Sequence, residues 1–128
     1  MRYGYSKKSG LPFPETVEKI KESLKTVGFG VLTEIDVKST MKKKLNVDYD
    51  NYLILGACNP PFAHKALQAE KEIGLLLPCN VIVYEDNGDV YVSAILPSIA
   101  MQMIDNPALA EIANEVEGKI KQAVDGVV

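Results

Sequence analysis

The side chains best placed for chemistry are the two cysteines of the chain. Cys58 and Asn59 follow an apolar segment and come directly before Pro60 and Pro61, two residues that suit the open first turn of a helix. Free backbone N–H groups and the helix dipole favour negative charge at such a place, so they would stabilise a thiolate at Cys58. Cys58 is therefore a candidate nucleophile, with Cys79 as a candidate resolving thiol.

Both cysteines also have a purely structural interpretation. Unpaired cysteine is among the most often buried residue types, and this favours Cys58 as a small core residue at the end of a strand. Burial is favoured more strongly for Cys79, which lies between Pro78 and an apolar strand face. If the two strands are neighbours, the sulfur atoms could come within reach of a disulfide or a shared metal, but the sequence does not establish the strand order.

A zinc site is a third interpretation of the same residues. Cys58, Cys79 and the single histidine, His64, would supply three ligands, and water or a second subunit would complete the tetrahedron. The helical spacing instead favours a solvent-facing His64, on one face with Gln68 and Lys71. We expect no other cofactor, because the chain has no Gly-rich phosphate loop, no Rossmann fingerprint and no His-Glu-x-x-His or Gly-x-Ser-x-Gly motif.

A strong hairpin signal lies downstream of the cysteines, where Asn87-Gly88 separates two alternating apolar segments. A two-residue turn there would place Tyr84 opposite Tyr91 and turn Cys79 toward an apolar layer. The tyrosines could line a pocket or a subunit interface. Cross-strand aromatic pairs also stabilise hairpins by roughly 0.2 to 1 kcal/mol without any ligand, and that structural role is the default.

The remaining elements follow from periodicity and from turn residues. The pattern predicts strands over 2–8, 29–35, 52–58, 79–85 and 90–96, and helices over 14–27, 37–45, a stretch from 60 and a long stretch from 107. We expect Phe29, Val31 and Ile35 to share one strand face, and Leu45 to lie on the apolar side of the second helix. The order β-α-β-α-β-α-β-β-α predicts an α+β fold with a mostly antiparallel sheet covered by helices in a single pair of layers.

Size and charge limit the classes of function. The 128 residues, with 47% hydrophobic and 24% charged side chains, fit one globular domain over 1–128. A net charge of −3 disfavours a nucleic acid partner, and the basic run at 42–44 fits a solvated helix face. No segment approaches the ~20 apolar residues of a membrane span, and no apolar run follows the first residues, so we expect a cytoplasmic protein with reduced thiols and no membrane partner.

Three segments carry a resemblance to a known family. They are GFGVLTEIDV at 28–37, GACNPPFAHKAL at 56–67 and IGLLLPCNVIVYE at 73–85, and the pairing of Cys-Asn-Pro-Pro with Leu-Pro-Cys-Asn is the most specific element. Over nearly its whole length the chain resembles the domain-of-unknown-function family 302 of small prokaryotic proteins. The resemblance implies a compact α+β fold, a homodimer and no established activity, and it draws attention to Asn59 and Asn80 as binding residues beside the two cysteines.

These observations favour a dimeric binding or assembly module over an enzyme. Its small-molecule ligand cannot be read from the residues. Thiol-based redox or sulfur chemistry at Cys58 and Cys79 is the first alternative, and the zinc site is the second.

Overall fold

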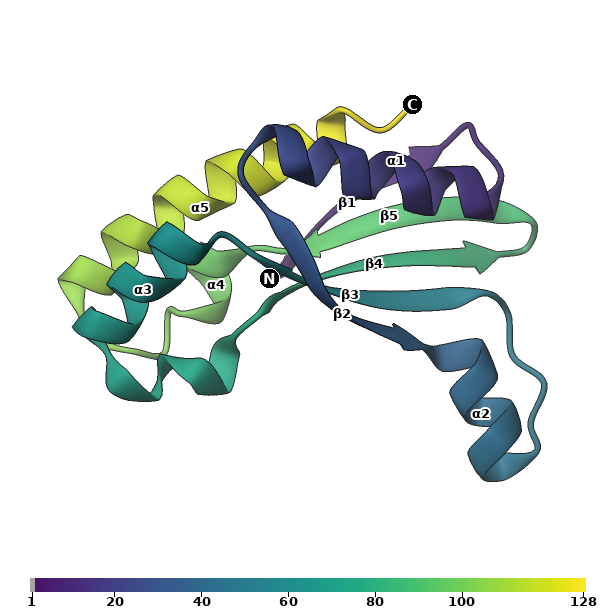
Figure 1. Ribbon diagram of the computed structural model, residues 1–128, viewed down its shortest axis with the longest axis horizontal. Coiled ribbons are helices and arrows are strands. Elements are labelled where there is room, and N and C mark those ends of the chain that lie inside the picture. The colour runs from purple at the N-terminus through teal and green to yellow at the C-terminus, as the bar shows by residue number, and fades with distance from the viewer. Residues whose placement is uncertain (1) are drawn as a thin grey trace.

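The computed structural model describes residues 2–128 and has a five-stranded antiparallel sheet at its centre (Figure 1). Its strand order is β1-β5-β4-β3-β2, so the two edge strands are β1 and β2. The strands are β1 (Gly4–Ser9), β2 (Gly30–Asp36), β3 (Tyr52–Cys58), β4 (Cys79–Asp86) and β5 (Asp89–Ile95). The predicted α+β class, antiparallel pairing and element order are confirmed.

The β4–β5 hairpin forms as its turn residues predict. Asn87 and Gly88 both have positive φ, 51° and 84°, which a two-residue type I′ turn requires. Tyr84 consequently pairs with Tyr91. The strand before the hairpin, β3, pairs with β4, so the strands that carry Cys58 and Cys79 are direct neighbours.

Two long helices cover one face of the sheet. Helices α1 (Phe13–Thr26) and α5 (Pro107–Asp125) lie together on the same side in Figure 1 and contact β1, β4 and β5. Their apolar stripes pack on the inward side chains of the strands, and the core includes Ile20, Leu24, Leu55, Val81, Val83, Val92, Ile120 and Val124. The single pair of layers follows because each helix has only one apolar stripe to bury.

The segment from β2 into α2 (Val37–Leu45) departs from the expectation. A register shift between Val31 and Thr33 turns the rest of β2 over, so Ile35 pairs with Ile54 and does not share a face with Phe29. Helix α2 is capped by Asp36, which accepts a hydrogen bond from the Ser39 N–H. No residue of α2 is buried, and the predicted inward position of Leu45 is wrong.

A second, smaller core lies at the end of the sheet occupied by α3 (Pro60–Ala69), the 3-10 helix η1 (Lys71–Leu76) and α4 (Pro97–Ala100). Its buried residues are Ala66, Ile73, Met101, Leu109 and Ala113. The sequence pattern did not predict η1 or α4, because helices of four to six residues are too short for a helical period to show.

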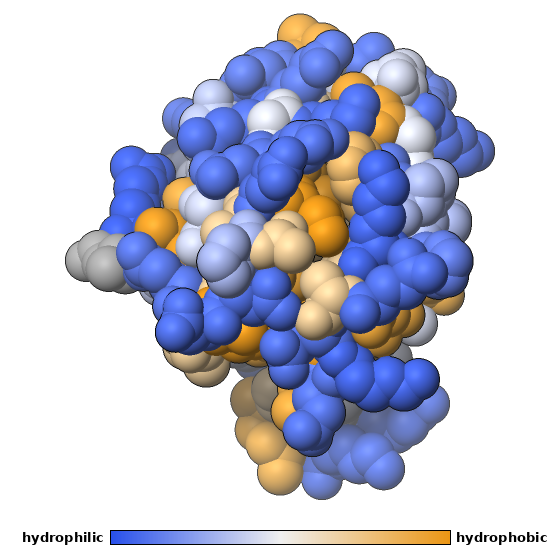
Figure 2. Space-filling view, turned by 90° about the vertical axis from the view of Figure 1, so that its left-hand side faces the viewer, coloured by the Kyte–Doolittle hydropathy of each residue, from blue (hydrophilic) through white to orange (hydrophobic). Residues whose placement is uncertain are grey.

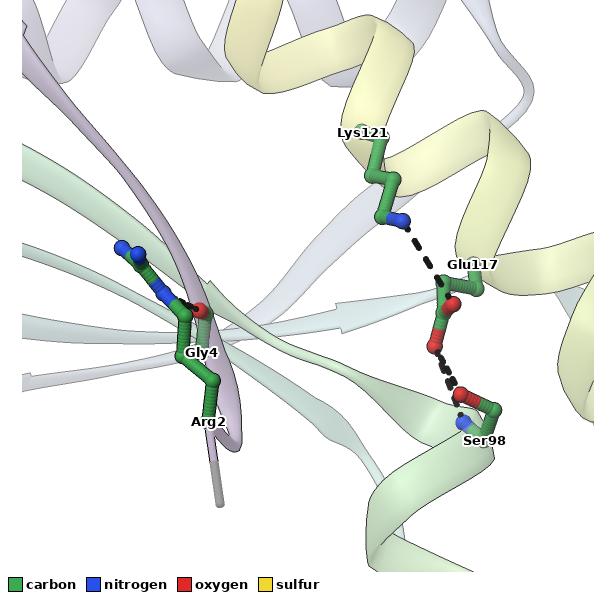
Figure 3. A network of polar contacts seen from close by, with 5 residues as sticks. All are labelled: Arg2, Gly4, Ser98, Glu117 and Lys121. Atoms are coloured by element: carbon green, nitrogen blue, oxygen red, sulfur yellow. Dashed lines mark hydrogen bonds and ion pairs between the residues drawn. The ribbon is translucent and has the colours of Figure 1, made fainter.

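Polar contacts join α4 to α5 (Figure 3). The Glu117 carboxylate accepts hydrogen bonds from the N–H and hydroxyl of Ser98, at 3.1 and 2.5 Å, and its second oxygen lies 3.6 Å from Lys121 Nζ. The carboxylate thus satisfies an open backbone donor at the start of α4. Arg2, which is drawn beside this network, donates to the Gly4 carbonyl within the first strand region.

Candidate functional site

The turn from β3 into α3 brings the most distinctive sequence motif to one end of the sheet. Asn59 is the N-cap of α3, as predicted, and its Oδ1 accepts a hydrogen bond from the Phe62 N–H at 3.4 Å. Pro60 occupies the first helical position, where no backbone donor is needed. Cys58 is therefore the last strand residue before the helix start, and it is half-buried there.

A cavity of about 310 Å³ opens beneath α3, between the two cores. Its walls come from the start of β2, the end of β3, the start of β4, α3 and α5, and from the first residue of α4 and the residue after that helix. No charged side chain among residues 2–128 lines it. The lining residues are Phe29, Leu32, Ala57, Cys58, Asn59, Phe62, Ala63, Ala66, Leu67, Leu77, Pro78, Cys79, Pro97, Met101, Ile112, Ala113 and Val116. Figure 2, which looks at the α3 end of the molecule, shows apolar side chains reaching the surface between hydrophilic ones.

Both thiols contribute to the wall of this cavity, and both are free. Cys79 pairs with Ala57 across the β3–β4 ladder, which places it next to the strand end that carries Cys58. The expected burial of Cys79 is confirmed, since only 7% of the residue is exposed. Burial, and secondarily the negative charge of a Cys58 thiolate nearby, raise the pKa of the Cys79 thiol to about 11.

The structure does not assemble the predicted zinc site. His64 lies on the outer face of α3 and is exposed, because it precedes the buried Ala66 by two residues, about half a turn of helix, and the two side chains therefore point to opposite sides. Among residues 2–128 no group of three or more His, Cys, Asp or Glu side chains lies close enough to hold a metal ion. Cys58 and Cys79 both line the cavity, but they form no disulfide. The structure therefore does not support the predicted cysteine pair and shows two free thiols.

The predicted tyrosine pair belongs to a longer row of rings on the other face of the sheet. Tyr84 and Tyr91 stack with ring centroids 5.3 Å apart, Tyr52 stacks on Tyr84 at 5.6 Å, and Tyr49 lies 6.4 Å from Tyr52. Burial, followed by the neighbouring tyrosines, raises the pKa of the Tyr52 phenol. The row is separate from the cavity, so the two groups of predicted site residues occupy different places.

The remaining candidate, Asn80, is exposed on β4 opposite Gly56 and does not line the cavity. Sequence reasoning found Cys58, Asn59 and Cys79 but missed the apolar wall around them. Met101 and Ala113 stand far from the motif in the sequence, and nothing in their spacing connects them with Cys58. Only the folded chain brings them to one cavity.

The described residues, 2–128, include no helix whose length and apolar content would allow it to cross a bilayer.

Comparisons with known proteins agree with one another on the family. No curated protein matches the chain. A solved structure, the "uncharacterized conserved protein DUF302 from Bacillus stearothermophilus", is 32% identical, with complete coverage of both chains and a TM-score of 0.94. The family model for the domain of unknown function DUF302 matches residues 5–127. The chain therefore belongs to the DUF302 family.

Proposed function

We propose that the protein is a homodimeric binding module that holds an uncharged, apolar small molecule in the cavity beneath α3. The observation that carries this proposal is the cavity itself, about 310 Å³ in volume, with walls of aliphatic, aromatic and thiol side chains. That volume is at the lower end of the range for ligand pockets, which run from about 300 to 1,000 Å³ and are mostly apolar.

The chemistry of the wall defines the class of ligand. Moving a charge into an apolar site costs far more than the contacts return unless a partner charge is present, and none lines this cavity. The polar groups on the wall are the Asn59 amide and the thiols of Cys58 and Cys79. The amide oxygen already accepts one hydrogen bond in capping α3, so the amide offers a ligand its N–H groups and one remaining lone pair.

A neutral fluorophore, N-phenyl-1-naphthylamine, tests this proposal. We expect its fluorescence to rise on binding with a micromolar dissociation constant, because the cavity gives it an apolar environment. Ala63→Phe places a ring into the cavity from α3, whereas Ala110→Phe places the same ring on the exposed side of α5.

Binding should be lost in Ala63→Phe and kept in Ala110→Phe. If the fluorescence does not rise, or if both variants bind the probe as the unchanged protein does, the cavity is not the binding site. Circular dichroism on the same samples shows whether each variant remains folded.

Thiol chemistry at Cys58 is the second candidate function. It is supported by the half-buried position of Cys58 on the cavity wall at the start of α3, where a ligand in the cavity would contact its sulfur. Cys79 is less suited to the resolving role, because its raised pKa keeps it protonated near neutral pH.

Mild oxidation distinguishes this candidate from simple binding. Hydrogen peroxide followed by dimedone should add one dimedone to Cys58 if this thiol reacts, because dimedone traps sulfenic acids. Tandem mass spectrometry locates the adduct. An adduct that forms only after the protein is unfolded would remove thiol chemistry from consideration and leave the binding role standing.

A further inference from the structure

The second face of the sheet has an apolar surface that the helices of the core do not cover. In register across the strands lie Tyr52, Tyr84 and Tyr91, and the next row is Ile35, Ile54, Ile82 and Ser93. These side chains alternate with the core residues, so they point away from α1 and α5. All of them stay at least partly exposed. We call these two rows, together with Tyr49, the open face.

The segment that borders the open face is also unusually exposed. Half of the exposed large apolar residues of the described chain fall between residues 32 and 49: Leu32, Ile35, Leu45, Val47 and Tyr49. Helix α2, within this segment, extends away from α1 and α5 at the far end of β2 and β3 (Figure 1). A nine-residue helix without a buried residue gains little from tertiary packing, which is the usual source of helix stability.

We propose that the open face and α2 form the interface with a second copy of this chain, with the two sheets packed face to face. This interface lies apart from the ligand cavity and is the surface through which the proposed homodimer would form. It rests on the proposed function for the dimeric state alone. The occupant is a second copy of the chain, because a face that packs on the same face of another copy is fully used once two chains have met and leaves no surface for a third. Rows of rings and branched side chains on two such faces can interdigitate as in a β-sandwich.

The size of the surface is sufficient for a stable dimer. Exposed fractions are 50% for Ile35, 65% for Leu45 and 47% for Tyr49, and the rings of the row are partly exposed as well. With about 150 to 250 Å² for each large side chain when fully exposed, the open face and its border offer roughly 600 to 800 Å² per chain, close to the area of about 800 Å² that a standard interface buries on each partner. Apolar patches of this size are rare on monomers.

The sheet edges are less suited to self-association than its face. The edge strand β2 carries Glu34 and Asp36 and has a register shift between Val31 and Thr33, and charges and bulges both oppose strand addition. At the other edge, β1 carries Lys7 and Lys8. Lys8 also stands opposite Tyr91 at the rim of the tyrosine row, where it forms an ion pair with Asp89, and the rows of the open face inside this rim carry no charged side chain.

Sedimentation velocity of the full chain at about 1 to 100 µM tests the proposal, with Ile35→Lys and Tyr49→Lys as interface variants. Leu75→Lys and Met103→Lys are the matched controls, since both side chains are highly exposed and lie away from the open face. The unchanged chain and the controls should sediment as dimers of the 14.0 kDa chain. Each interface variant should raise the dissociation constant at least about 100-fold, because a lysine would be buried without a partner.

Monomeric unchanged protein at about 100 µM would overturn the proposal, and the face would then belong to a different partner. Interface variants that dimerise like the controls, or assemblies larger than two chains, would overturn it as well. Tyr49 lies outside the strands, so its variant tests the interface even if Ile35→Lys fails to fold. The ligand proposal is separable, because monomeric Tyr49→Lys should still bind N-phenyl-1-naphthylamine, and Ala63→Phe should still dimerise.

Discussion

The reactivity of Cys79 is the most direct quantitative consequence of the structure. A Cys58→Ser variant leaves Cys79 as the single thiol, and iodoacetamide then reports how often its thiolate is available. The structure buries all but 7% of Cys79 and raises the pKa of its thiol to about 11. Both effects slow alkylation, since the thiolate is the nucleophile and the reagent must reach it.

The expected magnitude follows from the pKa. At pH 8 a thiol with a pKa of about 11 is ionised in roughly one molecule in a thousand, against about a quarter for an ordinary cysteine with a pKa near 8.5. Because Cys58→Ser removes the smaller, Cys58 contribution to this pKa, ionisation alone should slow native Cys79 by up to about 200-fold relative to the same residue in urea, and burial should slow it further. Between pH 8 and 10 the native rate should rise about 100-fold, whereas the unfolded rate should rise only about fourfold.

Intact mass spectrometry of quenched samples measures both rates on the same protein. A native rate within about tenfold of the unfolded rate at pH 8 would contradict the buried position of Cys79 and its raised pKa. The reciprocal Cys79→Ala variant reports Cys58 alone. Because Cys58 is half-buried on the cavity wall, N-phenyl-1-naphthylamine should protect it from alkylation if the probe occupies the cavity.

Three further predictions concern stability and are all measured by urea denaturation. Burial raises the pKa of Cys79 to about 11, so the unfolded chain loses this proton first as the pH rises. Between pH 9 and 11 the free energy of unfolding should therefore fall by about 2 kcal/mol more in the unchanged chain than in Cys79→Ala, and equal pH profiles would contradict this. Glu117→Ala should cost about 1 to 2 kcal/mol because the start of α4 loses its acceptor, whereas the exposed Glu115→Ala should be nearly neutral. Gly28→Ala should lower the free energy of unfolding by about 1 to 2 kcal/mol, because φ is +86° at this position. Gly118→Ala, in open space on α5, should raise it by about 0.5 to 1 kcal/mol. Effects of the same sign would refute the backbone argument.

The sequence alone determined the local elements of this protein. The Asn87-Gly88 turn, the caps at Asp36 and Asn59, and the stop at Gly28 all follow from interactions within a few residues, and the structure confirms each of them. The burial of Cys79 also follows, because the turn sets the register of the hairpin and the register sets the face.

Only the tertiary structure decided how these elements combine. The strand order brings Cys58 beside Cys79, and the cavity joins them to Met101 and Ala113 from a distant part of the chain. The register shift in β2 reversed the expected orientation of Ile35, and the exposure of α2 was not foreseen either. Such features depend on contacts between residues far apart in the sequence, and local periodicity carries no information about which distant surfaces will meet.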